Sequence, residues 1–368
     1  MLPKIPLSSS EDCIDIKLDF SNHNLNYISN FEKDLEKYLN SNKKVVALNS
    51  GTSAIHMALI LANVKRGDEV LCQSFTFSAS ANPIVYQGAN PVFIDSEPET
   101  WNMCPNLLED AIKDRILNKK KPKAIIVVHL YGMPAKIDEI YRIAKKYEII
   151  LIEDAAETLG STYMGQKCGT FGDFGILSFN TNKIITAFGG GALVCKSEDV
   201  KNEAIYLATQ AKDDAPHYQH SEVGYNYRMS NVVAQIGRGQ MKVLNDRILS
   251  RRKNNKFYQK LFKNIEGARI FIEPNADFFS NHWLSCVIID KEKLKPTREE
   301  LRIALLEEGI ESRPLWKPLH LQPVFKNTFY YNNNISEKLF LNGLCLPSGS
   351  NLSNKDRDRI AEVINRLL

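Results

Sequence analysis

Long hydrophobic runs and an excess of charge of one sign are both missing from this sequence. No apolar run approaches the ~18 residues that a membrane-crossing helix needs. The first residues, Met-Leu-Pro-Lys-Ile-Pro followed by serine and acidic residues, lack the apolar centre of a signal peptide. Lysine and arginine number 47 against 43 aspartate and glutamate residues, so the formal net charge is only +4. The sequence therefore predicts a soluble, cytoplasmic protein without a nucleic-acid footprint.

Paired cysteines are also missing. The seven cysteines are scattered along the chain with no Cys-x-x-Cys pair, and an odd, scattered set fits neither a disulfide framework nor a zinc site. We expect reduced thiols and no metal centre. The cysteines are Cys13, Cys72, Cys104, Cys168, Cys195, Cys286 and Cys345.

What the sequence does contain is an alternation of strand and helix patterns between residues 45 and 155. Apolar strands are predicted at 45–48, 69–72, 91–94, 124–129 and 149–153, with helical spacing between several of them. This alternation is typical of a parallel sheet wrapped by crossover helices.

The rest of the chain changes character. Glycine-punctuated β segments are predicted at 174–179, 183–186 and 189–195, which indicates closely packed backbone beside a site. A proline-free stretch at 231–265 predicts one long helix. Two strands (268–272, 283–289) and two helices (near 297–308 and 355–368) follow. With roughly 100 to 200 residues per domain, we expect a large domain over 1–240 and a small C-terminal α+β domain over 241–368.

Two polar segments follow predicted strands. Ser50-Gly51-Thr52-Ser53 lies between a strand and a helix, where free N–H groups, the helix dipole and two hydroxyls make an anion site. Helix capping explains the same residues and, taken alone, is favoured. Glu153-Asp154 ends an apolar strand, where side chains of a parallel sheet point into a ligand crevice. A protonated ring nitrogen is one partner for such a carboxylate; a salt bridge or a loop cap is the alternative.

Two further segments can be interpreted either as cofactor contacts or as ordinary structural residues. Lys183 precedes a triple glycine by six residues, and a lysine in such a pocket suits Schiff-base chemistry, although most lysines are simply solvated. Ser74-Phe75-Thr76-Phe77 follows a strand and either lays a ring on a flat cofactor or packs in the core.

In chain order these features are a phosphate cradle, an aromatic ring, an acidic residue and a lysine. That order resembles pyridoxal-phosphate (PLP) enzymes, and six motifs resemble the DegT/StrS family of sugar-nucleotide aminotransferases. The resemblance implies an α/β fold, the type I fold of PLP-dependent transferases (aspartate aminotransferase-like), with a mainly parallel sheet and a small C-terminal domain. The motifs are Asn49-Ser-Gly-Thr-Ser-Ala, Ile152-Glu-Asp-Ala-Ala-Glu, Gly172-Asp-Phe-Gly, Ser178-Phe-Asn-Thr-Asn-Lys, Gly189-Gly-Gly and Gly224-Tyr-Asn-Tyr-Arg-Met.

Within that family, four stretches are most similar to the 4-aminotransferases of the UDP-N-acetylbacillosamine pathway. They begin at Ala208, His217, Ser312 and Cys345. The resemblance implies a UDP-linked 2-acetamido-4-keto-2,6-dideoxyhexose as substrate and L-glutamate as amino donor. Open alternatives are another nucleotide-linked keto sugar (GDP-perosamine or dTDP-amino sugar type), a PLP-dependent sugar dehydratase, which Lys183 disfavours, and a non-catalytic binder.

The resemblance also implies roles for single residues. Lys183 is the lysine that binds the cofactor covalently and acts as acid and base, and Asp154 keeps the pyridine nitrogen protonated. Asn226 reaches the partner's cofactor phosphate across a homodimer interface. The implied cofactor contacts are Gly51, Thr52, Ser53, Phe77, Asp154, Glu157, Ser178, Lys183 and Asn226; the implied substrate contacts are Ser21, Asn22, Gly51, His217, Arg228, Arg313 and His320. A structural ion pair is the alternative for Arg228, and a surface loop for the segment from Arg313 to His320.

Overall fold

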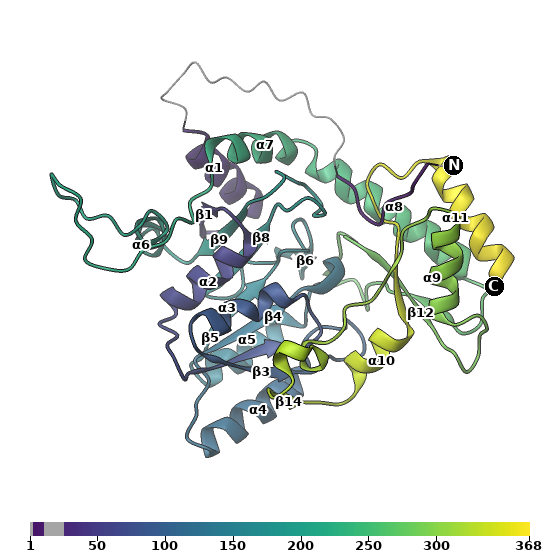
Figure 1. The fold of residues 1–368 in the computed structure, drawn as a ribbon, viewed down its shortest axis with the longest axis horizontal. Coiled ribbons are helices and arrows are strands. Elements are labelled where there is room, and N and C mark those ends of the chain that lie inside the picture. The colour runs from purple at the N-terminus through teal and green to yellow at the C-terminus, as the bar shows by residue number, and fades with distance from the viewer. Residues whose placement is uncertain (1–2, 11–25) are drawn as a thin grey trace.

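The computed structural model describes residues 3–10 and 26–368 (Figure 1). Within them lies an eight-stranded sheet in the order β1-β9-β8-β5-β4-β2-β3-β14. β9 runs antiparallel to both of its neighbours, and the remaining pairs in the sheet are parallel. The strands are β1 (Lys44–Leu48), β2 (Glu69–Gln73), β3 (Asn90–Ile94), β4 (Ala124–Val128), β5 (Ile150–Asp154), β8 (Phe174–Ser178), β9 (Gly191–Cys195) and β14 (Phe329–Tyr331). The predicted α/β class with a mainly parallel sheet is confirmed.

Helices cover both faces of this sheet (Figure 1). Alternate residues of a strand point to opposite faces, and in β1 Val45 and Ala47 enter one hydrophobic cluster while Val46 and Leu48 enter another. A sheet buried on both faces explains the near-continuous apolar runs. The helices of this part are α1 (Tyr27–Leu39), α2 (Gly51–Leu61), α3 (Asn82–Tyr86), α4 (Pro105–Leu117), α5 (Ile137–Lys146) and α6 (Glu198–Ala208).

The C-terminal part has a core of its own. An antiparallel sheet, β10-β12-β15-β13, packs with α8, α9 and α11 around buried residues such as Val287, Leu301 and Ile360. The predicted strands and helices after residue 267 are confirmed. The elements are α7 (Asn231–Met241), α8 (Leu244–Phe262), β10 (Ala268–Ile270), β12 (Ser285–Ile289), α9 (Arg298–Glu307), β13 (Arg313–Pro314), α10 (Ile335–Asn342), β15 (Gly343–Leu346) and α11 (Asn354–Leu367).

Two strand pairings help to join the C-terminal part to the rest. β14 pairs with β3 at the edge of the large sheet, and β11 (Phe278–Phe279) pairs with β6 (Thr162–Tyr163), which pairs in turn with β7 (Gln166–Lys167). The domain boundary near residue 240 stays a prediction.

Two element predictions were wrong. Residues 183–185 form bends instead of a strand, because Lys183 N–H donates to Asn180 O and Ala187 N–H donates to Phe179 O, which closes a loop. The expected long helix is divided into α7 and α8 at residues 242–243, where the N–H groups bond three residues back. Gly237 and Gly239 lower helix propensity just before the break.

Two absences concern only the described residues. None of their helices is long and apolar enough to cross a membrane. Their six cysteines are buried and free of disulfides; Cys13 lies outside the described residues.

Candidate active site

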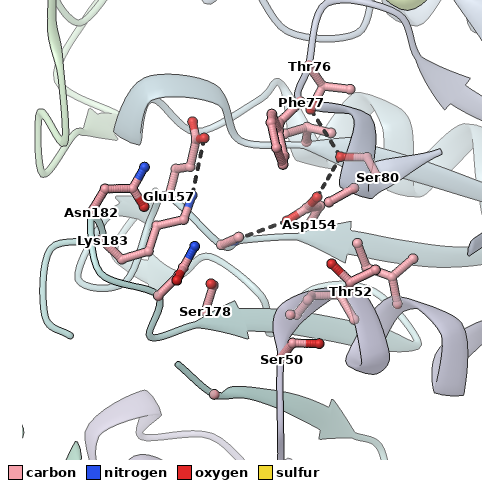
Figure 2. A pocket seen from close by; sticks show the side chains of 18 of the residues that line it. Ser50, Thr52, Thr76, Phe77, Ser80, Asp154, Glu157, Ser178, Asn182 and Lys183 are labelled. Atoms are coloured by element: carbon pink, nitrogen blue, oxygen red, sulfur yellow. Dashed lines mark hydrogen bonds and ion pairs between the residues drawn. The ribbon is translucent and has the colours of Figure 1, made fainter. Parts of the chain in front are cut away.

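A cavity of about 330 Å³ lies at the carboxyl ends of β4, β5 and β8. The carboxyl ends of parallel strands form the usual ligand crevice of such sheets. Figure 2 shows the amine, carboxylate and hydroxyl groups of different elements turned toward this one space. Seven of the predicted cofactor contacts line it: Gly51, Thr52, Phe77, Asp154, Glu157, Ser178 and Lys183.

The turn before α2 caps the helix and also borders the cavity. Ser50 caps the helix, because its Oγ accepts from Ser53 N–H at 3.0 Å. The Ser53 hydroxyl donates to Asn49 Oδ1 at 2.5 Å, and Ser53 does not line the cavity. Gly51 and Thr52 do line it, and N–H groups of a first helical turn have no acceptor inside their helix. Gly51, Thr52 and the nearby Ser178 hydroxyl are therefore placed where they could hold an anion.

The triple glycine lets β9 approach this turn closely. A Cβ on Gly191 would lie 2.3 Å from Gly51 N and 2.6 Å from Ser50 O, both backbone atoms. No side chain fits there, so the predicted close backbone packing beside a site is confirmed at this position.

Asp154 lies on the cavity wall. Its side chain is buried, Oδ2 accepts from Ser80 Oγ at 2.7 Å, and Oδ1 accepts from Ala156 N–H at 3.2 Å. Among the described residues, no lysine, arginine or histidine forms an ion pair with Asp154. A buried carboxylate without a counter-charge is costly, which fits a site for a cationic ring nitrogen.

Glu153, the preceding residue, points to the other face and has a structural role. Its carboxylate accepts from the N–H groups of Gly169, Phe171 and Gly172 at 2.5 to 2.9 Å. His129 Nε2 lies 3.0 Å from it, and His129 Nδ1 accepts from a backbone N–H, so Nε2 carries the proton. The loop-cap interpretation therefore holds for Glu153, whereas Asp154 accepts one loop N–H and also lines the cavity.

Lys183 reaches the cavity from the side opposite Asp154 (Figure 2). Its Nζ lies 3.4 Å from Glu157 Oε1 and 4.3 Å from the ring centroid of Trp283. The other carboxylate oxygen of Glu157 accepts from Tyr131 N–H at 2.7 Å. Burial raises the pKa of Glu157, and the charge of Lys183 opposes that shift only in part. The pair therefore places an amine and a carboxyl group able to exchange a proton at the cavity.

Aromatic rings form another part of the wall. Phe75 is fully buried in the core, whereas Phe77 is 56% exposed and lines the cavity. The Trp316 ring lies 5.7 Å from the Phe77 ring. The core interpretation is therefore confirmed for Phe75, whereas Phe77 lies where its ring could contact a cofactor. Sequence reasoning gave no site role to several lining residues, among them Ser80, Asn180, Asn182 and Trp283. Nothing in the spacing around Trp283 marks it.

Most of the predicted substrate contacts lie elsewhere. Arg228 donates to the buried Glu32 and to Ala47 O, which is the ion-pair interpretation. Arg313, 66% exposed at its side chain, binds Glu311, and His320 is held between Ser74 and Glu337. His217 is exposed on the segment after α6, which extends away from the body of the molecule (Figure 1). Ser21 and Asn22 lie outside the described residues.

Asn226 does not line the cavity of its own chain either. Its side chain is exposed, and its backbone oxygen accepts from Asn49 Nδ2 at 3.1 Å.

The cavity residues fit pyridoxal phosphate on their own chemistry. A lysine for covalent attachment, a buried carboxylate lacking a cation, and a helix N-terminus with hydroxyl groups face one space, and Gly191 keeps the cradle free of a Cβ. Of the cofactor contacts predicted, the structure brings seven together and leaves Ser53 and Asn226 outside.

Comparisons with known proteins agree with this chemistry. A family model described as the DegT/DnrJ/EryC1/StrS aminotransferase family matches residues 19–365. A putative pyridoxal phosphate-dependent aminotransferase, EpsN of Bacillus subtilis, is 48% identical over 92% of this chain and 87% of its own length. GDP-perosamine synthase of Escherichia coli O157:H7 is 36% identical over 92% and 90%. The crystal structure of a DegT DnrJ EryC1 StrS aminotransferase from Brucella abortus superposes with a TM-score of 0.86 at 30% identity, covering 93% of this chain and 90% of that one.

Proposed function

Because this chain belongs to the DegT/DnrJ/EryC1/StrS aminotransferase family, and is a PLP-dependent sugar aminotransferase, we propose a specific reaction for it. It transfers the amino group of L-glutamate to the 4-keto carbon of a UDP-linked 2-acetamido-4-keto-2,6-dideoxyhexose. The product is a UDP-4-amino-4,6-dideoxy-N-acetylglucosamine, used for surface glycan biosynthesis of the bacillosamine type. The observation that carries the aminotransferase chemistry is that Lys183 and Asp154 face one cavity from opposite sides.

Support for the UDP sugar comes from the four stretches that resemble the bacillosamine-pathway 4-aminotransferases. A second candidate is the GDP-linked keto sugar, which the 36% identical GDP-perosamine synthase favours. Both reactions use the same cavity residues, so the catalytic proposal holds for either nucleotide.

The bound cofactor supplies an electron sink that stabilises the carbanion formed at the carbon losing its proton. In this proposal Lys183 Nζ would bind the cofactor covalently. Once released, the same amine is the base that takes up and returns the proton at the reacting carbon. Lys183 Nζ lies 3.4 Å from Glu157 Oε1, so the Glu157 carboxylate can accept the proton from the amine.

The two carboxyl groups, Asp154 and Glu157, act on different atoms. Asp154, fixed by Ser80 and by Ala156 N–H, holds a proton on the ring nitrogen through its negative charge. Glu157, fixed by Tyr131 N–H, lies beside Nζ, and burial raises its pKa toward the range in which it can exchange a proton. We assign it to the side of the cofactor that carries the phenolic oxygen.

The remaining contacts orient the cofactor. Gly51, Thr52 and Ser178 hold its phosphate with N–H and hydroxyl donors, and Phe77 stacks on its ring. Ser53 stabilises the same turn through its bond to Asn49. Trp316 lies beside Phe77 on the cavity wall.

A homodimer completes the site in this proposal. Asn226 is exposed and does not line the cavity of its own chain, which supports a contact with the partner's phosphate. The exposed His217 on the projecting segment and Arg228 at its base are the chain's contribution to the partner's substrate pocket. Arg313 and His320, with Ser21 and Asn22, complete the proposed set for the sugar and nucleotide.

The test is turnover with L-glutamate and a matched pair of 4-keto sugars, one linked to UDP and one to GDP. The proposal expects amine formation at carbon 4 of the UDP sugar, read by mass and NMR. Good turnover of the GDP sugar with none of the UDP sugar would select the second candidate. Loss of water without amine formation would point to a dehydratase, and binding without turnover to a non-catalytic binder.

A further inference from the structure

The backbone of Lys183 is held by residues from far along the chain. Lys183 lies in a loop instead of a strand, so no sheet neighbour fixes its carbonyl group. The Ser10 hydroxyl donates to Lys183 O at 2.7 Å, and the Ser8 hydroxyl donates to Asn182 O at 2.9 Å. Trp283 Nε1 donates to the same Asn182 O at 2.7 Å. Three side chains thus hold two successive carbonyl groups at the base of the lysine.

One guanidinium group connects these three holders. Arg251 of α8 is fully buried and donates through NH1 to Trp283 O at 2.5 Å. Its NH2 donates to Ser8 Oγ at 3.1 Å and to Ser10 Oγ at 2.9 Å. The planar fork of arginine reaches several acceptors in fixed directions, which a lysine ammonium cannot reproduce.

The charge of Arg251 is unusual for its surroundings. Burial, together with the nearby charge of Arg247, lowers its pKa to about 9, so it stays a cation at neutral pH. No carboxylate among the described residues pairs with it, and its acceptors are hydroxyl and carbonyl oxygens. Burying an ion without a counter-ion is costly, so a simple packing role would be served better by an apolar side chain.

The arginine also sets the direction of the hydrogen bonds. A guanidinium only donates, so each serine hydroxyl accepts from Arg251 and has its proton directed to a carbonyl. Hydrogen bonds in such a chain polarise one another, which strengthens each link. The result is two parallel relays, from Arg251 through Ser8 to Asn182 and from Arg251 through Ser10 to Lys183.

We propose that Arg251, Ser8 and Ser10 are positioning residues that fix the backbone of Lys183 and so aim its amine at the cofactor. The inference rests on the proposed role of Lys183 as cofactor anchor. A lysine side chain is long and flexible, so the place of its amine depends on a fixed backbone at one end and on Glu157 at the other. A misplacement of about 1 Å is enough to reduce a catalytic rate roughly 100-fold.

The experiment removes the relays and leaves the segment in place. Ser8→Ala/Ser10→Ala is compared with Ser9→Ala, a matched control whose hydroxyl lies between the two and contacts Asn351 instead of the lysine loop. Arg251→Lys keeps the positive charge and loses the fork. Ser10→Ala alone is the milder variant if the double variant does not fold.

Three readouts are taken. Hydrogen exchange of amides 180–188 in enzyme freed of cofactor reports on the loop itself, visible circular dichroism reports on the orientation of bound cofactor, and kinetics separate kcat from KM. We expect faster exchange, an altered dichroism band and a kcat about 10-fold lower in the double variant, with KM for the sugar nearly unchanged. Arg251→Lys should show the same pattern, and Ser9→Ala should match wild type.

The proposal is overturned if the double variant and Arg251→Lys resemble Ser9→Ala in exchange, dichroism and kcat. It is also overturned if they lose only thermal stability. Those outcomes leave the proposed function intact, because wild type still binds cofactor and turns over. If wild type itself retains no cofactor, the function fails, and the exchange measurement on the cofactor-free protein still decides whether the cluster fixes the loop.

Discussion

At the residue scale, neighbouring positions with the same chemistry have different fates. Glu153 caps a loop while Asp154 faces the cavity, and Phe75 fills the core while Phe77 lines the site. The sequence predicted that both segments lie at strand ends, because strand ends follow from local patterns. It left the division between core and cavity open, because that depends on which face of the sheet each side chain meets.

Glu157 gives a pH-dependent prediction. Burial raises its folded-state pKa above the ordinary value of 4.5, so the folded state holds the proton more tightly than the unfolded state. Protonated Glu157 therefore stabilises the fold. Its contribution to the free energy of unfolding is full below about pH 4 and is lost as the pH rises through the raised pKa. Glu157→Gln removes the titration. We therefore expect the melting temperature of the variant, relative to wild type, to be higher at pH 8 than at pH 5.

Differential scanning calorimetry on cofactor-free protein provides this comparison. A variant that is relatively less stable at pH 8 than at pH 5 would mean that the ion pair with Lys183 outweighs burial. The sign assigned to the pKa shift would then be wrong.

At the element scale, the approach of β9 to the turn before α2 gives a prediction with a built-in control. A Cβ at Gly191 would meet backbone atoms at 2.3 to 2.6 Å, whereas a Cβ at Gly189 meets nothing within 4 Å. Gly191→Ala should cost about 1–3 kcal/mol of unfolding free energy, as overpacking does, and weaken cofactor retention. Gly189→Ala should stay close to wild type in denaturant unfolding. Equal effects of the two substitutions would contradict the packing account.

The elements also show how far a sequence carries a fold prediction. β1 to β5 follow from apolar runs, since a sheet buried on both faces leaves a strong local signal. The loop at 183–186 was predicted as a strand because Ile184 and Ile185 are apolar. Instead of pairing with a sheet neighbour, Lys183 O accepts from Ser10 Oγ, and Asn182 O just before it accepts from Ser8 Oγ. β14 was missed, because its partner β3 lies more than 200 residues earlier.

At the scale of the whole molecule, segments far apart in the sequence connect the N-terminal and C-terminal parts at several places. β14 joins the large sheet, and segment 3–10 connects α8 with the lysine loop. We propose a large cofactor-binding domain over 1–240 and a small domain over 241–368 that meet around the cavity, to which Trp283 and Trp316 contribute.

The proposed dimer predicts complementation between an inactive chain and a weakened one. Lys183→Ala destroys the site of its own chain, and Asn226→Ala weakens the site of its partner. Co-expressed chains should therefore recover about a quarter of wild-type activity, from one working site in each mixed dimer. Each variant expressed alone is the control. No recovery in verified mixed dimers would place Asn226 in its own chain's site or remove it from the site.

The central claim is that Lys183 binds pyridoxal phosphate covalently, and borohydride reduction tests it most directly. The purified protein should absorb in the visible region, lose that band on reduction, and yield a peptide whose added mass maps to Lys183. Lys183→Ala should yield no such peptide. A protein that retains no cofactor, or a label that maps to another lysine, would contradict the account.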